Sequence, residues 1–251
     1  MQRLHLTLDT PAENIALDEA LLDAAEAARP DLEYLRIWES PTPLVVVGRS
    51  SRADEVDLEF CRTRGIPVLR RSSGGAAIVA GPGCLMYAVV LSYGQRPEAR
   101  GVHQSHDYVL ARIVAALQPQ VPRVAKAGTS DLVVLPPAAT NELPRKFSGN
   151  SLRVKRSHFL YHGTLLYDFD LTLLSQCLRT APRQPEYRRE RDHAAFVTNL
   201  PLPQKTLIAA LDAAWPTDGP LTHWPQQQVA ELLRDRYRHA EWNLTAACPS
   251  G

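Results

Sequence analysis

The chain has 251 residues, with 28 Lys and Arg against 27 Asp and Glu, a formal net charge of +1 and 45% hydrophobic residues. This length and apolar fraction are enough for one large domain with a sizeable core. A net charge so close to zero argues against a general nucleic-acid-binding protein, and no apolar run approaches the ~20 residues that cross a bilayer. The N-terminal stretch Met1–His5 lacks the apolar core of a signal peptide, so we expect a cytoplasmic protein.

The first half of the chain predicts a helix followed by short buried strands. Thr10 fits an N-cap, Pro11 the first helical position and Glu13 a capping box, while Arg29 and Pro30 end the helix. Strands are expected at 33–38, 44–47, 66–71 and 85–92, and further helices at 54–64 and 106–117.

The second half predicts a β-hairpin, with helices closing the chain. Strands are expected at 131–135, 147–156 and 158–167, and helices at 171–178, 204–214 and 226–238. The charged, proline-bearing residues 179–193 have no apolar period and fit a surface loop. Because strands and helices do not alternate regularly, we predict one α+β domain over 1–251, a mixed sheet flanked by helices, with a poorly ordered tail after about residue 245.

Two segments stand out chemically, and the first is a small-residue loop at Ser72–Gly75 that follows a strand. Backbone N–H groups in such loops can be approached closely and bind anions. Arg70 and Arg71 at the root of the loop could add charge-assisted hydrogen bonds. A plain β-turn with solvated arginines has the same spacing, and spacing alone favours that simpler interpretation.

The second segment is the predicted hairpin. Lys146, Ser148 and Asn150 are expected to share one face of its first strand, and His162 and Thr164 one face of its second. Brought to one site, a lysine among polar groups can stabilise charge on a transferring phosphoryl or acyl-phosphate group. A solvated hairpin face explains the pattern equally well.

Together these segments resemble the lipoate–protein ligase A family, within the wider superfamily of biotin and lipoate ligases and octanoyltransferases. The resemblance rests on RRSSGGAA at 70–77, GTSDLVV at 128–134, RKFSGNSLR at 145–153 and YHGTLL at 161–166, supported by ENIALDEALL at 13–22, VVVGR at 45–49 and FVTNL at 196–200. Each motif alone is weak, but their shared order and spacing from roughly residue 10 to 245 are specific to the superfamily.

The resemblance implies a mixed sheet packed against helices, in an enzyme that activates lipoate or octanoate with ATP as an acyl-adenylate and then acylates a lysine of a lipoyl domain. It implies that Lys146 is the catalytic lysine, and that Asp131 places the nucleotide with its Mg²⁺. The other implied adenylate contacts are Arg70, Ser73, Gly74, Gly75, Ala76, Ser148, Gly149, His162, Gly163 and Thr164. Trp38 and Val79 are expected to touch the acyl chain in an apolar tunnel.

Some positions depart from the family pattern. Ala76 stands where a third glycine is usual, and Thr129-Ser130-Asp131 replaces the usual Arg-Asn-Asp. No small accessory domain follows Trp242-Asn243, so a separate accessory protein could be needed for adenylation. The expected partner is a lipoyl-domain carrier protein; neither nucleic acid nor a membrane is expected, and a monomer is the default. The arginine-rich segment 179–191 fits a solvated loop as well as one that docks an acidic lipoyl domain or folds over the adenylate.

The alternative enzyme is a cysteine-dependent octanoyltransferase or amidotransferase, which carries the acyl group on a thiolate. Cys84 and Cys177 are the candidate nucleophiles, although both lie outside the matched motifs and core packing explains them better. A non-catalytic acyl- or nucleotide-binding subunit is a third hypothesis. His103 and His106 lack a third metal ligand, so we expect surface histidines, and Gly48–Arg52 is not the Gly-Arg-Gly-Arg loop of biotin ligases.

Overall fold

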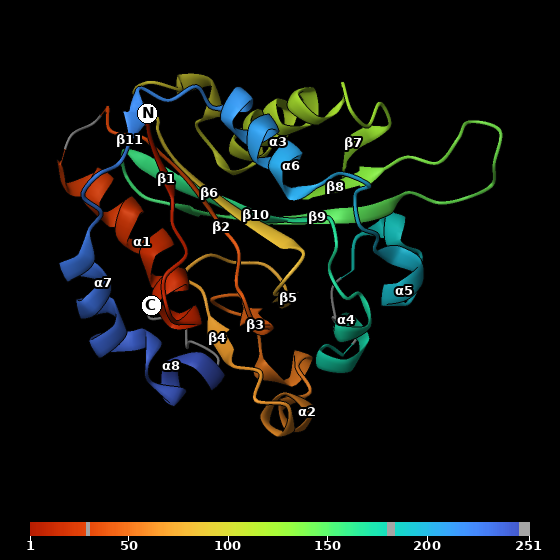
Figure 1. Cartoon of the computed structure of the whole chain (residues 1–251), viewed down its shortest axis with the longest axis horizontal. Helices are drawn as coiled ribbons and strands as arrows, with labels where there is room; N and C mark the ends of the chain where they lie inside the picture. Colours follow the sequence, from red (N-terminus) through yellow and green to blue (C-terminus); the bar gives the residue numbers. More distant parts are fainter. Residues whose placement is uncertain (29–30, 180–183, 246–251) are drawn as a thin grey trace.

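A computed structural model describes the chain except for residues 29–30, 180–183 and 246–251. The tail expected after about residue 245 therefore lies outside the described residues. Two β-sheets and the helices around them give a mixed α+β architecture (Figure 1), so the predicted fold class is confirmed.

The large sheet has eight strands and is mixed. Its order is β11 (Gly219–Pro220), β1 (Gln2–His5), β2 (Tyr34–Trp38), β6 (Cys84–Ser92), β10 (His158–Leu166), β9 (Arg145–Val154), β8 (Asp131–Val134) and β7 (Val124–Ala127). Strand β1 runs parallel to both of its neighbours, whereas β6, β10, β9 and β8 run antiparallel in turn. A smaller sheet has the order β4 (Val68–Arg70), β3 (Leu44–Val47) and β5 (Ile78–Ala80).

Helices cover one face of the large sheet, and a helix together with the small sheet covers the other (Figure 1). The first face packs against α3 (Val102–Leu117) and α6 (Gln204–Ala214). The second packs against α1 (Pro11–Ala28) and the small sheet. The remaining helices are α2 (Leu58–Thr63), α4 (Thr172–Cys177), α5 (His193–Phe196), α7 (Gln226–Leu232) and α8 (Ala240–Leu244), with a π-helical turn at Leu233–Tyr237.

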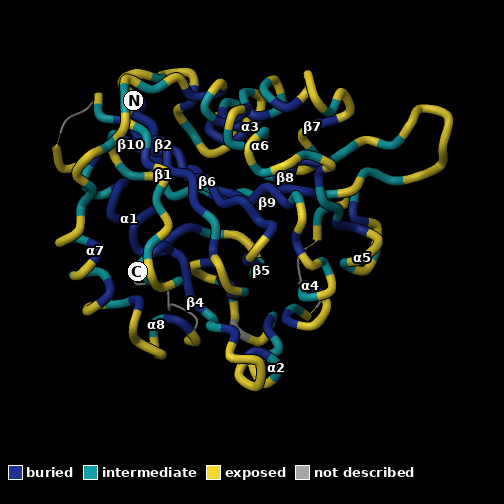
Figure 2. The backbone as a smooth tube through the Cα atoms, in the orientation of Figure 1, coloured by how far each residue is buried: buried dark blue, intermediate teal, exposed yellow. Residues whose placement is uncertain are grey.

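The central strands β6 and β10 are buried on both faces along nearly their whole length, as Figure 2 shows. Side chains alternate between the faces of a strand, so Phe159 and Tyr161 of β10 enter the core under α3 and α6. Leu160 and Leu166 enter the other core. By the same alternation, His162 projects toward α1 and the small sheet.

The structure departs from the predicted elements mainly where strands are short. Strands β1, β5 and β7 have only three or four residues and no alternating pattern long enough to be recognised. The helix expected over 54–64 is split into a 3₁₀ turn and α2, because Asp57 caps α2 by accepting a hydrogen bond from Phe60 N at 2.9 Å.

Candidate active site

A cavity of about 370 Å³ lies between the large sheet, α1 and the small sheet. Ile15, Val46, Ile78 and Met86 make part of its wall apolar. The wall also carries the titratable side chains Asp18, Arg71, Asp131, Lys146 and His162. The cavity therefore combines an apolar surface with a few convergent polar groups, as small-molecule sites do.

The glycine loop lines this cavity through Gly75 and Ala76. Its path is fixed by close backbone contact, because a Cβ on Gly48 would lie 1.9 Å from the carbonyl oxygen of Gly75. Ser151 Oγ donates to the carbonyl oxygen of Gly74 at 2.7 Å, and Ser51 Oγ donates to that of Gly75 at 2.8 Å. Gly75 has φ +88°, a conformation that suits glycine. The loop is thus held between the small sheet and β9.

Of the two arginines before the loop, Arg71 and not Arg70 reaches the cavity. Arg70 is fully buried, and its guanidinium donates to the carbonyl oxygens of Gly48 and Trp242 at 2.6 and 2.8 Å. The expectation that Arg70 lines the site is therefore wrong, because successive residues point to opposite sides of an extended strand. Arg71 lines the cavity and donates to Ser73 Oγ at 3.0 Å. Burial lowers the pKa of Arg71 to about 10, so it remains charged at neutral pH.

A β-bulge directs Lys146 into the cavity. Val133 of β8 pairs with Lys146 and Leu132 pairs with Ser148, so Phe147 between them has no opposite residue. The bulge places Phe147 in the core under α3 and α6 while Lys146 faces the cavity. It also makes the expected common strand face wrong, since the bulge shifts Ser148 and Asn150, which hydrogen-bond to each other, out of the alternation that begins at Lys146. Ser148 still lines the smaller of two adjoining cavities and Asn150 the larger one.

Lys146 is paired with Asp131. Its Nζ lies 2.7 Å from Asp131 Oδ1. The lysine side chain passes over Gly149, and a Cβ added to Gly149 would lie 3.0 Å from Nζ. The other carboxylate oxygen, Oδ2, accepts a hydrogen bond from the hydroxyl of Tyr187 at 2.7 Å. Burial and Asp131 raise the pKa of Tyr187, so this phenol stays protonated and donates. Tyr187 belongs to the segment predicted as a surface loop, and Pro185 of that segment lines the cavity.

A second cavity of about 140 Å³ adjoins the first. Its lining includes Val79, Ser148, Thr164, Leu174 and Phe196. Both cavities share Ala76, Ala77, Ile78, Lys146, Gly149 and Pro185. Lys146 therefore stands at the junction of the two.

Trp38 lies elsewhere. It is buried, with the guanidinium carbon of Arg36 4.9 Å from its ring centroid, and it lines neither of these cavities. The expectation that Trp38 touches the acyl chain is therefore not supported, because Arg36 and not a ligand covers its ring. Val79 is separated from the larger cavity too, since it lines only the smaller of the two.

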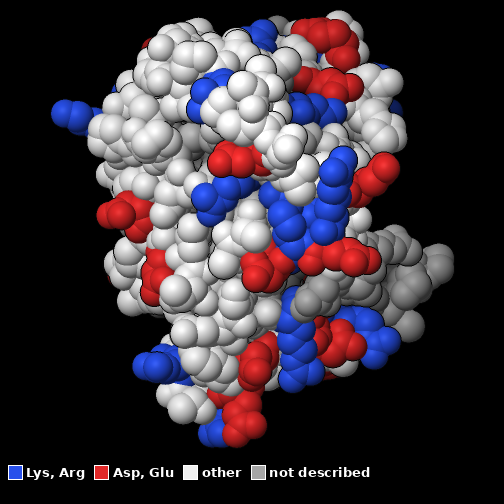
Figure 3. All heavy atoms as spheres, turned by 90° about the vertical axis from the view of Figure 1, so that its right-hand side faces the viewer, with Lys and Arg blue, Asp and Glu red and all other residues white. Residues whose placement is uncertain are grey.

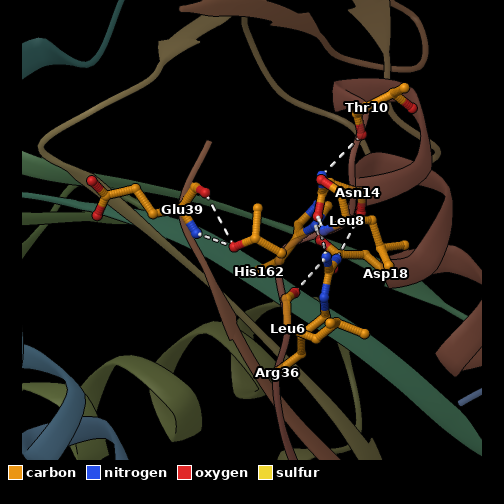
Figure 4. Close-up of polar contacts among 9 residues, drawn as sticks. Leu6, Leu8, Thr10, Asn14, Asp18, Arg36, Glu39 and His162 are labelled. Atoms are coloured by element: carbon orange, nitrogen blue, oxygen red, sulfur yellow. Dashed lines mark hydrogen bonds and ion pairs between the residues drawn. The ribbon is translucent and has the colours of Figure 1, made fainter. Parts of the chain in front are cut away.

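Beneath the first cavity a chain of polar side chains runs from the glycine loop into the core. His162 Nε2 lies 2.6 Å from Ser73 Oγ, and His162 Nδ1 lies 3.1 Å from Asp18 Oδ2. Asp18 Oδ1 pairs with Arg36 at 2.6 Å, and Arg36 also donates to Asn14 Oδ1 at 2.6 Å (Figure 4). Burial alone would raise the pKa of Asp18, but Arg36 and His162 hold it below its ordinary value.

Sequence reasoning missed Asp18, Arg36 and Tyr187. A signal existed for Arg36, which is the central residue of the buried strand YLRIW. A fully buried arginine needs an anionic partner, and Asp18 lies among apolar residues in the helical stretch IALDEALL. No comparable pattern marks Tyr187, whose partner Asp131 is 56 residues away.

The cysteine candidates lie apart from the cavities. Cys84 and Cys177 are fully buried, and burial raises the pKa of both thiols, that of Cys177 to about 12. A raised pKa disfavours the thiolate, which is the nucleophilic form. Among the described residues no cysteine lines either cavity.

The histidine pair shows no sign of metal binding either. His106 is buried, contrary to the expected surface position, with Nδ1 2.9 Å from the hydroxyl of Tyr161. Burial lowers its pKa to about 4. Within the described part of the chain, no group of three or more His, Cys, Asp and Glu could hold a metal ion.

Figure 3 shows the end of the molecule that carries β8, β9 and α5. Basic and acidic side chains are interspersed on this face and do not form one basic field. This agrees with the near-balanced composition of the chain. Among the described residues, no helix is long and apolar enough to cross a membrane.

Comparison with known proteins decides the family. Residues 10–209 match the sequence profile of the lipoyl protein ligase A/B catalytic domain. The chain belongs to this family. Two of its relatives have different names. A candidate lipoate-protein ligase A from Aeropyrum pernix is 30% identical over 237 residues, covering 94% of this chain and 78% of that protein. The second, the octanoyltransferase LipM of Geobacillus kaustophilus, is 25% identical over 265 residues, covering 93% and 94%.

Solved structures of ligases share the fold of this lipoyl ligase family member. A bi-partite lipoate protein ligase of Thermoplasma acidophilum, studied with its E2 lipoyl domain, superposes with a TM-score of 0.81 at 22% identity, covering 99% of this chain and 98% of that one. A lipoate-protein ligase A bound with ATP gives a TM-score of 0.76 at 22% identity, covering 97% and 98%. The protein is thus an enzyme of the lipoate ligase and octanoyltransferase family.

Proposed function

We propose that the protein is an ATP-dependent lipoate–protein ligase. It activates lipoate or octanoate as the acyl-adenylate and transfers the acyl group to a lysine of a lipoyl domain. The observation that carries this proposal is the position of Lys146 at the junction of two cavities, paired with Asp131. An acyl-adenylate has two parts, joined at a phosphate, and two adjoining cavities with a cation between them match that shape.

The lining of each cavity suggests its occupant. The larger cavity has an apolar wall at Ile15, Val46 and Met86, which suits a medium-length acyl chain. The smaller cavity is lined by Phe196 and Leu174, which offer an aromatic and an aliphatic surface to a purine. In this arrangement the α-phosphate and the acyl carbonyl meet beside Lys146 and the glycine loop.

The first half-reaction places extra negative charge on the α-phosphate. The acyl carboxylate attacks phosphorus, the bond to pyrophosphate breaks, and pyrophosphate leaves. The ammonium of Lys146 and the guanidinium of Arg71 are the cavity cations that can offset this charge. Mg²⁺ arrives with ATP as part of the substrate. A single protein carboxylate, Asp131, together with phosphate oxygens and water suits Mg²⁺, and the described residues hold no larger acidic cluster.

In the second half-reaction the neutral amine of the acceptor lysine attacks the acyl carbonyl, and AMP leaves. Holding amine and carbonyl together can remove on the order of 7–11 kcal/mol from the barrier at best. The described part of segment 179–191 supports a position over the adenylate, because Pro185 lines both cavities and Tyr187 contacts Asp131. A lipoyl domain is the expected acceptor, as studied with the Thermoplasma relative.

A transferase remains the alternative because four relatives, each of nearly the same length as this chain, are octanoyltransferases. A thiol mechanism requires a reactive cysteine beside the acyl carbonyl. The buried positions of Cys84 and Cys177, away from both cavities, favour the ligase.

Intact-mass spectrometry of an apo lipoyl domain tests the proposal. The domain is incubated with this protein, lipoate or octanoate, and MgATP, and AMP release is measured in parallel. We expect a mass gain of one acyl group that requires ATP. If acyl groups are transferred from prepared lipoyl-adenylate but no adenylate forms from lipoate and ATP, a separate accessory protein is needed for adenylation, and adding a second ligase subunit should restore it. Acylation from octanoyl-acyl carrier protein without ATP, lost in Cys84→Ser or Cys177→Ser, would overturn the ligase in favour of the transferase.

A further inference from the structure

The larger cavity contains two titratable side chains, Asp18 and His162, that the proposed reaction has not yet used. Its titratable side chains are Asp18, Arg71, Asp131, Lys146 and His162. We propose that His162 accepts the proton released when the acceptor amine forms the amide, and that Asp18 and Arg36 position it for this role. This inference rests on the proposed function and adds a proton acceptor to its second step.

The other four side chains are poor proton acceptors. Arg71 and Lys146 are cations that already carry their protons. Asp131 accepts from both Lys146 and Tyr187, and Asp18 is paired with Arg36 in the core. Imidazole is the side chain that exchanges protons near neutral pH, and the His162 ring is 11% exposed, at the cavity wall.

Hydrogen bonds define which nitrogen is free to accept. A carboxylate only accepts, so the contact of 3.1 Å to Asp18 Oδ2 places the proton on Nδ1. Nε2 is then the unprotonated nitrogen, and the Ser73 hydroxyl donates to it at 2.6 Å. Arg71 donates to the same hydroxyl oxygen at 3.0 Å, which turns the hydroxyl proton toward His162. The basic lone pair of His162 therefore points to the glycine loop.

Charges around His162 allow it to become an imidazolium. On α1, Asp18 contacts the ring directly, and on β2 Arg36 neutralises the far oxygen of that carboxylate. Arg71 acts from the loop side through Ser73, and Ser151 lies opposite His162 in the β9 register. Asp18 can thus stabilise the imidazolium, while Arg36, held also by Asn14, keeps Asp18 in place (Figure 4).

Proton transfer to His162 accompanies amide formation and the release of AMP. The neutral amine attacks the acyl carbonyl carbon, the C–N bond forms, and the nitrogen becomes positively charged. A proton of this nitrogen passes to His162 Nε2 as the hydrogen bond from the Ser73 hydroxyl to Nε2 breaks. The bond between the carbonyl carbon and the phosphate oxygen then breaks, and AMP leaves with the electron pair. His162 returns the proton to water.

Measuring the two half-reactions separately tests this role. Adenylate formation is followed by lipoate-dependent AMP and pyrophosphate production, and transfer by single-turnover acylation of an apo lipoyl domain from prepared lipoyl-adenylate. In His162→Gln we expect adenylate formation within about twofold of wild type. Transfer should fall by about 10²–10³-fold, within the range for a lost proton acceptor. The rise of the transfer rate with pH should also shift in the variant.

Matched variants separate the chemical role from a structural one. His158 lies on the same strand with Nδ1 3.3 Å from Glu26, outside both cavities, so His158→Gln should leave transfer unchanged. Asp18→Asn should slow transfer less than His162→Gln while keeping adenylate formation. His162→Ala should regain part of its transfer rate when imidazole is added to the buffer.

The outcomes distinguish this inference from the proposed function. Equal loss of both half-reactions in His162→Gln, with a folded protein by circular dichroism, would show that His162 only forms the wall, and the inference would be wrong. Unchanged transfer in that variant would also refute it. If wild-type protein neither forms the adenylate nor transfers from it, the proposed ligase function is what fails.

Discussion

The two faces of the large sheet use the same strands for different purposes. Toward α3 and α6, the strands present Phe147, Phe159 and Leu165, and the result is a packed core. Toward α1 and the small sheet, the neighbouring positions present Lys146 and His162, and the result is a cavity lined by charges. A shift of one residue in strand register would exchange the side chains on the two faces. The location of the site is therefore decided by strand register and by the bulge at Phe147.

Polar groups also differ between the faces. Inside the core under α3 and α6 the buried groups pair without charge, as Tyr87 does with Asn150 at 2.5 Å and His106 with Tyr161 at 2.9 Å, and the ion pair of Lys126 with Asp107 lies at the exposed edge. On the cavity face they form ion pairs, Lys146 with Asp131 and Arg36 with Asp18. A pair of neutral groups rigidifies a core, whereas ion pairs that border a cavity can be rearranged by a charged ligand. Substitutions in the packed core should consequently lower stability but not activity, whereas substitutions of the cavity lysine should lower activity.

Removing the cavity lysine should have the largest effect. In Lys146→Ala, the ammonium that offsets charge on the α-phosphate is lost, and we expect acylation to fall by at least about 10²–10³-fold. The melting temperature should change little, because this lysine side chain is 26% exposed. Acyl transfer to a lipoyl domain and thermal melts measure the two quantities.

Lys126→Ala is the matched control for this prediction. Lys126 is also a strand lysine paired with an aspartate, Asp107, but it lies outside both cavities. Activity should stay close to wild type in this control. Full activity in Lys146→Ala would contradict the assignment of the charged face as the active face.

The largest effect on stability is expected from the buried arginine. Arg36→Met leaves the carboxylate of Asp18 buried without its cation, which costs about 3–5 kcal/mol of unfolding free energy. Chemical denaturation measures the loss. Arg36→Met combined with Asp18→Leu removes both charges and should recover most of it.

A substitution on the packed face gives the contrast. Phe159→Ala removes a fully buried ring from the core under α3 and α6 and should cost a similar amount, about 3–5 kcal/mol. Below its melting temperature this variant should keep its catalytic constant. An Arg36→Met variant that is as stable as wild type would show that the ion pair of Arg36 with Asp18 does not stabilise the fold beneath the larger cavity.

These contrasts indicate what the sequence could reveal. Long elements with clear signals, such as α1 with its Thr10–Glu13 capping box, were predictable because their determinants are local. The glycine loop and Lys146 were found by motif. Strand pairing between distant parts of the chain decides that Arg71 and not Arg70 lines the cavity, and it also creates the bulge at Phe147. No local pattern encodes such pairing, so these features required the structure.

Filling the apolar wall should change the preferred acyl chain. Met86 lines the larger cavity and belongs to the core on that face. Met86→Phe adds a rigid ring to the wall proposed to bind the acyl chain, so the preference for longer over shorter acids should fall about tenfold, the low end of the discrimination that one methylene group gives. Competition between hexanoate, octanoate and lipoate measures it. An unchanged ratio would place the acyl chain elsewhere, and Leu85→Phe on the other face is the control.

The smallest expected effect concerns the pH dependence of stability at the hairpin turn. Glu26 at the end of α1 accepts hydrogen bonds from Ser157 N and His158 N at 3.2 and 3.0 Å. Burial alone would raise the pKa of Glu26, but these hydrogen bonds hold it below its ordinary value. A lowered folded-state pKa means that the stabilisation is present above the unfolded-state pKa and is lost as pH falls through the folded-state pKa.

Glu26→Gln should therefore lower the unfolding free energy at pH 7 by less than about 1 kcal/mol, since the carboxylate is still partly exposed to solvent and its interactions are screened. Near pH 3 the difference should shrink, because a protonated glutamate and a glutamine are nearly equivalent. Urea denaturation at both pH values measures this, with the exposed Glu98→Gln as control. A deficit that is equally large at both pH values would mean that packing, and not the charge of Glu26, joins α1 to the turn of the hairpin that carries Lys146 and His162.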